Sequence, residues 1–102
     1  MKTEKLLTIP KPRLGQIQRL ARTSAKCRED AIALSGVLQR LTQEERAQIH
    51  ALVSFGRRGG PRSFRSALEQ AARYDLNLVP GMYSEDPTFR SCLTKGLVRY
   101  AR

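Results

Sequence analysis

The 102-residue sequence has few of the side chains on which catalysis, disulfide scaffolds and membrane insertion depend. It contains no tryptophan, one histidine and two cysteines, and aromatic residues make up only 6% of the chain. No apolar run approaches the roughly 20 residues that span a bilayer, so we expect no membrane partner. The first ten residues hold an apolar stretch much shorter than that of a secretory signal, which favours a cytoplasmic location.

The scarcity of reactive side chains also argues against an enzyme. Cys27 and Cys92 have no C-x-x-C partners, so both are expected to be reduced thiols rather than part of a disulfide scaffold. His50 has no nearby Cys, Asp or Glu in a nucleophile or metal-ligand pattern. A zinc site made from these three residues would need a fourth ligand that the sequence does not indicate. We therefore expect no catalytic residue, no metal and no cofactor.

The sequence does contain an ordinary apolar content and a large excess of positive charge. Hydrophobic residues make up 40% of the chain, enough for a folded core. A chain of this length buries only roughly 65% of its unfolded surface, which supports a single domain spanning residues 1–102. Lys and Arg number 19 against 9 Asp and Glu, a formal net charge of +10. Fourteen of the 19 are Arg, whose forked donors suit phosphate and carboxylate, so the bias favours a binding surface.

Apolar residues recur at spacings of three and four along almost the whole chain, which is typical of amphipathic helices. No segment alternates like a strand over a useful length. The expected helices run from about Pro12 to Lys26, from Asp30 to Leu41, from Thr42 through Val53, from Ser63 through Ala72, and from Asp86-Pro87 to the C-terminus. We therefore predict an all-α, compact orthogonal bundle of about five helices with a Gly/Arg-rich loop in the middle.

Individual helix signals differ in strength. The segment Thr42-Gln43-Glu44-Glu45 is a capping box and is the clearest local signal in the chain. In the helix before it, Ile32 is expected to face inward with the other large apolar residues. The segment from Asn77 to Ser84 contains Pro80-Gly81 and indicates a turn or a single helical turn. Two roles are open for the tyrosines: they stack on nucleic-acid bases, or they seal the rim of the core. These residues are Tyr74, Tyr83 and Tyr100.

The segment from Gly56 to Pro61 must interrupt the helices, because it holds three glycines and a proline in six residues. Its spacing does not match the phosphate-loop pattern of nucleotide hydrolases. Two interpretations remain: Gly56 ends the preceding helix in a left-handed conformation, or the backbone amides and Arg57 and Arg58 contact an anion.

Most of the charge excess lies in two segments. Residues 1–28 carry eight basic residues and one acid, and residues 55–74 carry five basic residues and one acid. The candidate binding residues for a nucleic-acid backbone or an acidic partner are Arg13, Arg19, Arg22, Arg57, Arg58, Arg62 and Arg65.

Two functions fit this pattern. In the first, a small basic, non-enzymatic protein contacts the backbone of DNA or RNA without reading sequence. In the second, the same arginines bind an acidic protein surface, and the chain is an adaptor, an inhibitor or a subunit of a homo-oligomer.

The order of several motifs resembles a known family. These are Leu7-Thr8-Ile9-Pro10 before a helix, Leu52-Val53-Ser54-Phe55-Gly56-Arg57 closing another, Ala71-Ala72-Arg73, and Asp86-Pro87-Thr88-Phe89 with Leu93, Gly96 and Leu97. Together they are similar to the uncharacterised bacterial family called domain of unknown function 3775. The resemblance implies a short helical protein and brings no activity, cofactor or catalytic residue. The chain departs from the family in its short connection between the first two helices and in its basic rather than acidic charge.

Overall fold

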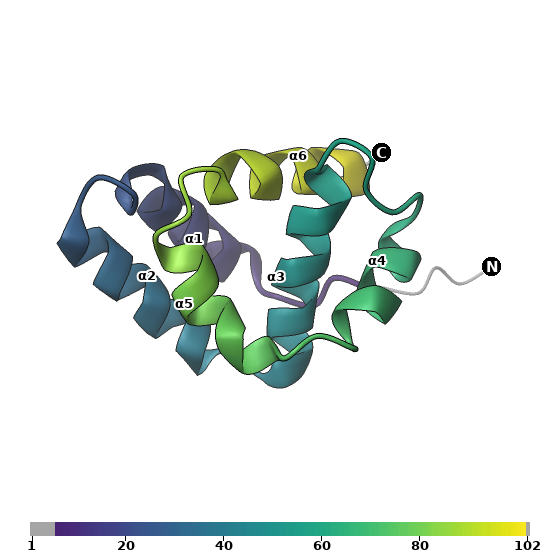
Figure 1. Cartoon of the computed structure of the whole chain (residues 1–102), viewed down its shortest axis with the longest axis horizontal. Coiled ribbons are helices and arrows are strands. Elements are labelled where there is room, and N and C mark those ends of the chain that lie inside the picture. Colours follow the sequence, from purple (N-terminus) through teal and green to yellow (C-terminus); the bar gives the residue numbers. More distant parts are fainter. Residues whose placement is uncertain (1–5, 102) are drawn as a thin grey trace.

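The computed structural model describes residues 6–101, which form an all-helical fold without strands (Figure 1). The α-helices are α1 (Lys11–Thr23), α2 (Arg28–Arg40), α3 (Gln43–Gly56), α4 (Phe64–Ala71), α5 (Val79–Ser84) and α6 (Phe89–Ala101), and the 3-10 helix η1 (Leu76–Leu78) directly precedes α5. The all-α prediction is confirmed. Six α-helices are present in this range rather than about five, because the expected single turn near Pro80 is the short helix α5.

Helix α3 lies at the centre of the molecule. It packs most extensively against α6 and α4, while α2 packs against α1 and α5. In Figure 1, α1 and α2 form one end of the molecule, α4 lies at the opposite end, and α6 crosses the top of α3. One continuous apolar core joins these helices, and its fully buried members include Ile17, Leu34, Leu52 and Leu93.

The helix starts that local sequence predicts most clearly are confirmed. Thr42 Oγ1 accepts a hydrogen bond from the Glu45 amide at 3.1 Å, and Glu45 Oε1 accepts one from the Thr42 amide at 3.0 Å. Ser63 Oγ accepts from the Ser66 amide at 3.1 Å and caps α4 in the same way. Each cap satisfies an amide that has no partner within the helix, which fixes where the helix begins.

Helix α2 differs from its prediction. It begins at Arg28 rather than Asp30, and Asp30 instead accepts a hydrogen bond from the Thr23 hydroxyl. The buried face of α2 contains Ala31, Leu34, Val37 and Leu38, so Ile32 points away from the core and is 63% exposed. The inward placement of Ile32 was therefore wrong.

Helices α3 and α6 cross in direct backbone contact at two glycines. A Cβ atom on Gly56 would overlap the Cys92 carbonyl oxygen, and a Cβ on Gly96 would overlap the Leu52 carbonyl oxygen. Gly56 does end α3, but the only glycine with positive φ among residues 6–101 is Gly59, at 78°. The expected left-handed conformation of Gly56 was wrong, and its lack of a side chain serves the helix crossing instead.

A buried glutamine fixes the segment that precedes α1. Gln48 of α3 is 1% exposed; its Oε1 accepts from the Thr8 amide and its Nε2 donates to the Thr8 hydroxyl, both at 2.8 Å. The Tyr100 hydroxyl accepts a further hydrogen bond from the Leu7 amide at 3.2 Å. The segment thereby satisfies buried polar groups while Leu7 and Ile9 enter the core.

Candidate functional site

The crossing of α6 over the end of α3 creates a basic cleft of about 600 Å3. One wall is the end of α3 and the loop that follows, and the other is the exposed side of α6. The lining residues are Phe55, Gly56, Arg57, Arg58, Gly59, Thr94, Lys95, Val98 and Arg99. Four of these nine residues are cationic and none carries a carboxylate, so the cleft suits an anion.

Arg99 holds the loop in place beside the cleft. Its Nη1 donates to the Phe55 carbonyl at 3.0 Å and to the Pro61 carbonyl at 3.2 Å. Its Nη2 lies 3.5 Å from the Arg62 carbonyl, and its guanidinium lies 4.2 Å from the centre of the Phe55 ring. Because these contacts occupy much of its donor capacity, Arg99 acts mainly as a positioning residue for the loop.

Arg57 and Arg58 remain available to a ligand. Both side chains are exposed, and neither makes a hydrogen bond or ion pair with any residue in the 6–101 range. They also border a second hollow of about 470 Å3 with Ser54, Gly60 and Gln70, on the side of the loop that faces α4. The two guanidinium groups can therefore turn toward an anion from either side of the loop.

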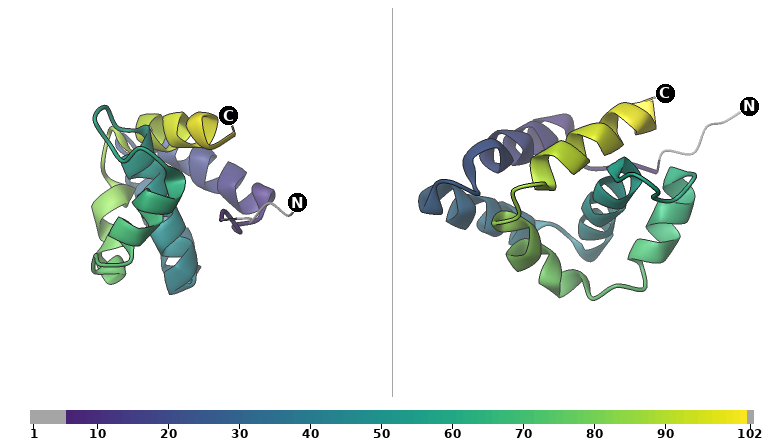
Figure 2. Two further views of the ribbon diagram at one scale, coloured as in Figure 1. Left: turned by 90° about the vertical axis from the view of Figure 1, so that its right-hand side faces the viewer. Right: turned by 45° about the horizontal axis from the view of Figure 1, so that its top comes forward.

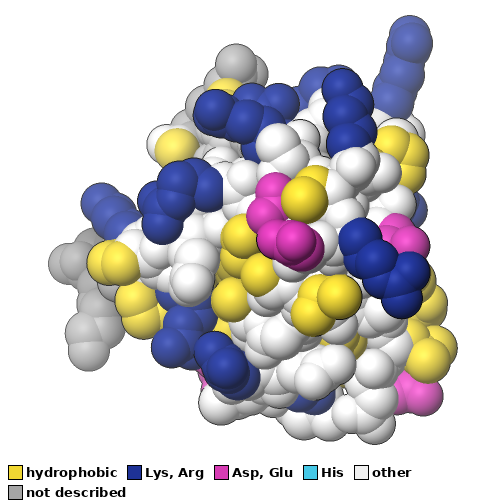
Figure 3. Space-filling view, turned by 90° about the vertical axis from the view of Figure 1, so that its left-hand side faces the viewer, with side chains coloured by type: hydrophobic (Ala, Val, Ile, Leu, Met, Phe, Trp, Pro, Cys, Tyr) yellow, Lys and Arg dark blue, Asp and Glu magenta, His cyan; other side chains and the backbone are white. Residues whose placement is uncertain are grey.

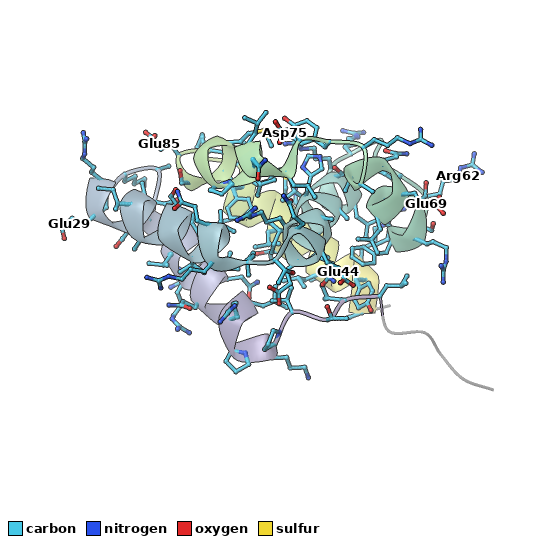
Figure 4. The ribbon with its side chains drawn as sticks, turned by 90° about the horizontal axis from the view of Figure 1, so that it is seen from below. Glu29, Glu44, Arg62, Glu69, Asp75 and Glu85 are labelled. Carbon is cyan, nitrogen blue, oxygen red and sulfur yellow. The ribbon has the colours of Figure 1, made fainter. Side chains whose placement is uncertain are left out.

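The acidic residues that Figure 4 labels are not part of the cleft lining. Glu29 and Glu85 lie toward one end of the molecule, and Glu69 lies at the other end near Arg62. None of these carboxylates is among the residues that line the cleft. The charged side chains in the lining of the cleft are therefore all cations.

The structure separates the seven predicted arginines. Arg57 and Arg58 line the basic cleft, whereas Arg62 and Arg65 lie beyond it, at the start of α4, with exposed side chains. The remaining predicted residues, Arg13, Arg19 and Arg22, belong to α1. In both views of Figure 2, α6 lies between α1 and the loop after α3, so the two basic segments do not line one cleft.

Lys95 and Arg99 are the cleft residues that sequence reasoning missed. They lie four residues apart, which places both on one side of α6. The C-terminal segment contains nearly as many acids as bases, so its net charge gave little signal. The i, i+4 spacing of Lys95 and Arg99 predicts that both cations share one side of a helix. It does not predict which other helix that side lies against.

A half-buried histidine of the central helix α3 pairs with a buried tyrosine of α5. His50 Nδ1 lies 2.6 Å from the Tyr83 hydroxyl, and the His50 ring stacks on Tyr74 with a centroid distance of 4.6 Å. Burial and, secondarily, the charge of Arg57 lower the pKa of His50 below its usual 6.5. Burial raises the pKa of the Tyr83 hydroxyl. The neutral imidazole is therefore favoured, and its tautomer decides whether His50 Nδ1 or the Tyr83 hydroxyl donates the hydrogen bond.

This pair predicts a loss of stability in mild acid. The unfolded chain takes up a proton on His50 below about pH 6.5, whereas the folded chain resists it, so stability should fall as pH falls through the range below 6.5. Thermal melts between about pH 7.5 and 5 should show this fall, and His50→Gln should flatten it. An equally steep dependence in the variant would show that other groups cause the effect.

The three tyrosines make contacts within the fold. Tyr83 is buried and stacks on Phe89 at 4.8 Å, and the Tyr74 hydroxyl donates to Met82 Sδ at 3.1 Å. With the hydrogen bond from Leu7 to Tyr100, all three tyrosines have intramolecular partners, which favours their core-sealing role. Over residues 6–101, no three His, Cys, Asp or Glu side chains group as metal ligands. No helix in this range is long and apolar enough to span a bilayer.

The family resemblance stays a prediction. Comparisons of this chain with protein-family models, with curated proteins and with solved structures give no match.

Proposed function

We propose that this protein is a small, non-enzymatic binder of nucleic-acid backbone, and that the basic cleft between α6 and the loop after α3 is its contact surface. The observation that carries the proposal is the convergence of Arg57, Arg58, Lys95 and Arg99 on one cleft without a carboxylate in its lining. Cations held in this way bind phosphate oxygens and release the counterions that surround a nucleic acid.

The cleft favours contacts to phosphates over contacts to bases. Its one aromatic residue, Phe55, is buried and covered by the Arg99 guanidinium, so it offers no free ring for base stacking. No helix N-terminus lines the cleft, and the loop is too short to enter a groove deeply. We therefore expect binding with little sequence preference and similar affinities for duplexes of different sequence.

The salt dependence of binding tests this function. Three to four phosphate contacts predict an affinity that falls roughly 40- to 150-fold between about 50 and 200 mM salt, as measured by fluorescence anisotropy with labelled DNA and RNA. Engagement of all seven predicted arginines would instead give a fall of several thousandfold. No binding at about 50 mM salt, or an affinity that salt leaves unchanged, would contradict the proposal and favour an acidic protein partner.

A further inference from the structure

The groove between α1 and α2 is a second exposed surface, remote from the loop after α3. It has a volume of about 610 Å3. Its apolar part is formed by Leu20 of α1 and by Ile32, Ala33 and Val37 of α2. Ile32 is 63% exposed, the largest value among the exposed large hydrophobic residues of the described chain. With the exposed Ala33 and the partly buried Leu20, Ile32 gives this groove an apolar surface that a partner could cover.

Gly36, which also lines the groove, provides an independent observation. A glycine inside a helix costs roughly 0.5–1 kcal/mol relative to alanine. A Cβ added to Gly36 would meet no atom within 4 Å, so packing among the described residues does not require glycine here. The open space above Gly36 lets another backbone approach α2 closely.

Charge indicates the kind of partner. Arg19 flanks the groove on α1 and Arg40 flanks it on α2, and neither makes a hydrogen bond or ion pair within residues 6–101. No carboxylate lines the groove. Figure 3 looks onto this end of the molecule and shows hydrophobic side chains near the middle of the face, with lysine and arginine side chains to the left, above and to the right. Acidic side chains also lie near the middle of this face, beside hydrophobic ones, but none belongs to the groove lining.

We infer that the groove between α1 and α2 docks an acidic, amphipathic helix of a partner protein. The groove residues of α2 run from Ile32 to Arg40, about 12 Å at 1.5 Å per residue, which matches two turns of a docked helix. Apolar side chains of that helix would contact Ile32 and Ala33, which are exposed, and its carboxylates would pair with the two flanking arginines. A second copy of this chain fits less well because each carries a net charge of +10. Nucleic acid fits less well because it would leave the apolar residues uncovered.

A synthetic helical peptide tests the inference directly. The probe is a peptide of about 18 residues with leucines at i, i+3, i+4 and i+7 and glutamates on both flanks. Its control has the same composition and charge, with the leucines distributed around the helix. We expect the probe, and not the control, to shift the NMR signals of backbone amides at Arg19, Ile32, Gly36 and Arg40 in the 15N-labelled full chain. Equal shifts with both peptides, or no shift at these amides, would overturn the inference.

A substitution that fills the groove tests the inference from the side of the protein, with a matched substitution outside the groove as its control. Gly36→Leu should weaken the probe at least about tenfold while leaving helicity intact, because its Cβ has open space. Ser91→Leu adds the same side chain at an exposed position of α6 outside the groove and should leave probe affinity unchanged. Unchanged affinity in folded Gly36→Leu would contradict the inference. Concentration-dependent dimerisation that Gly36→Leu abolishes would also overturn it, in favour of a second copy as the occupant.

Discussion

Replacing either glycine at the crossing of α3 and α6 with alanine should strongly destabilise the protein. The methyl group of Gly56→Ala would overlap the Cys92 carbonyl, and that of Gly96→Ala would overlap the Leu52 carbonyl. Both obstacles are helix backbone, so relief requires the two helices to move apart. We expect a loss of about 3 kcal/mol or more for each variant, near the upper end of overpacking effects. In a domain of this size that corresponds to a fall in Tm of at least about 12 °C.

Gly36 and Gly81 provide the control. A Cβ on Gly36 or Gly81 meets no atom within 4 Å, so alanine should be tolerated at both positions. Within α2, Gly36→Ala should stabilise the protein by about 0.5–1 kcal/mol, because alanine restricts the unfolded chain and favours helix. Thermal and urea denaturation of the four variants would measure this contrast. Equal losses of stability at all four positions would show that the close approach of α3 and α6 is not the reason why glycine is needed at Gly56 and Gly96.

Reversing the two arginines of the loop should abolish nucleic-acid binding. The double variant Arg57→Glu/Arg58→Glu replaces two cations of the cleft with two anions, which repel phosphate as well as removing its donors. We expect affinity for a DNA duplex to fall at least about a hundredfold at low salt. Both side chains are exposed and make no hydrogen bonds within the described part of the chain, so helicity and Tm should change little.

Charge reversal of two arginines on α1 distinguishes the contribution of the cleft to binding affinity from the contribution of net charge. Arg13→Glu/Arg22→Glu changes the formal charge by the same amount on exposed positions outside the cleft. This control should retain most of the affinity, apart from a general electrostatic loss. If both double variants lose affinity equally, binding depends on overall charge rather than on the cleft. If the loop variant unfolds, the loop has a structural role instead.

Local chemistry made much of the fold predictable. The caps at Thr42 and Ser63 depend on hydrogen bonds within three residues, so their spacing in the sequence was enough to place two helix starts. Ile32 was misplaced because apolar spacing allows more than one buried face on a short helix. Contacts with α1 and α5 decide which face of α2 is inside, and those contacts are remote in sequence.

The candidate cleft was predictable only in part. Arg57 and Arg58 were identified because glycines and a proline around paired arginines indicate an exposed basic loop. Lys95 and Arg99 join them only because α6 crosses the end of α3, and that crossing depends on two glycines 40 residues apart. No local pattern marks such a contact, so half of the cations in the cleft could be recognised only in the folded chain.

An NMR titration of the 15N-labelled protein with a DNA duplex of about 20 base pairs at low salt locates the nucleic-acid contact surface directly. We predict that the largest amide shifts fall around the basic cleft, at Arg57, Arg58, Gly59, Thr94 and Lys95. Largest shifts on α1, or no shifts at a duplex concentration that saturates a micromolar site, would contradict this prediction.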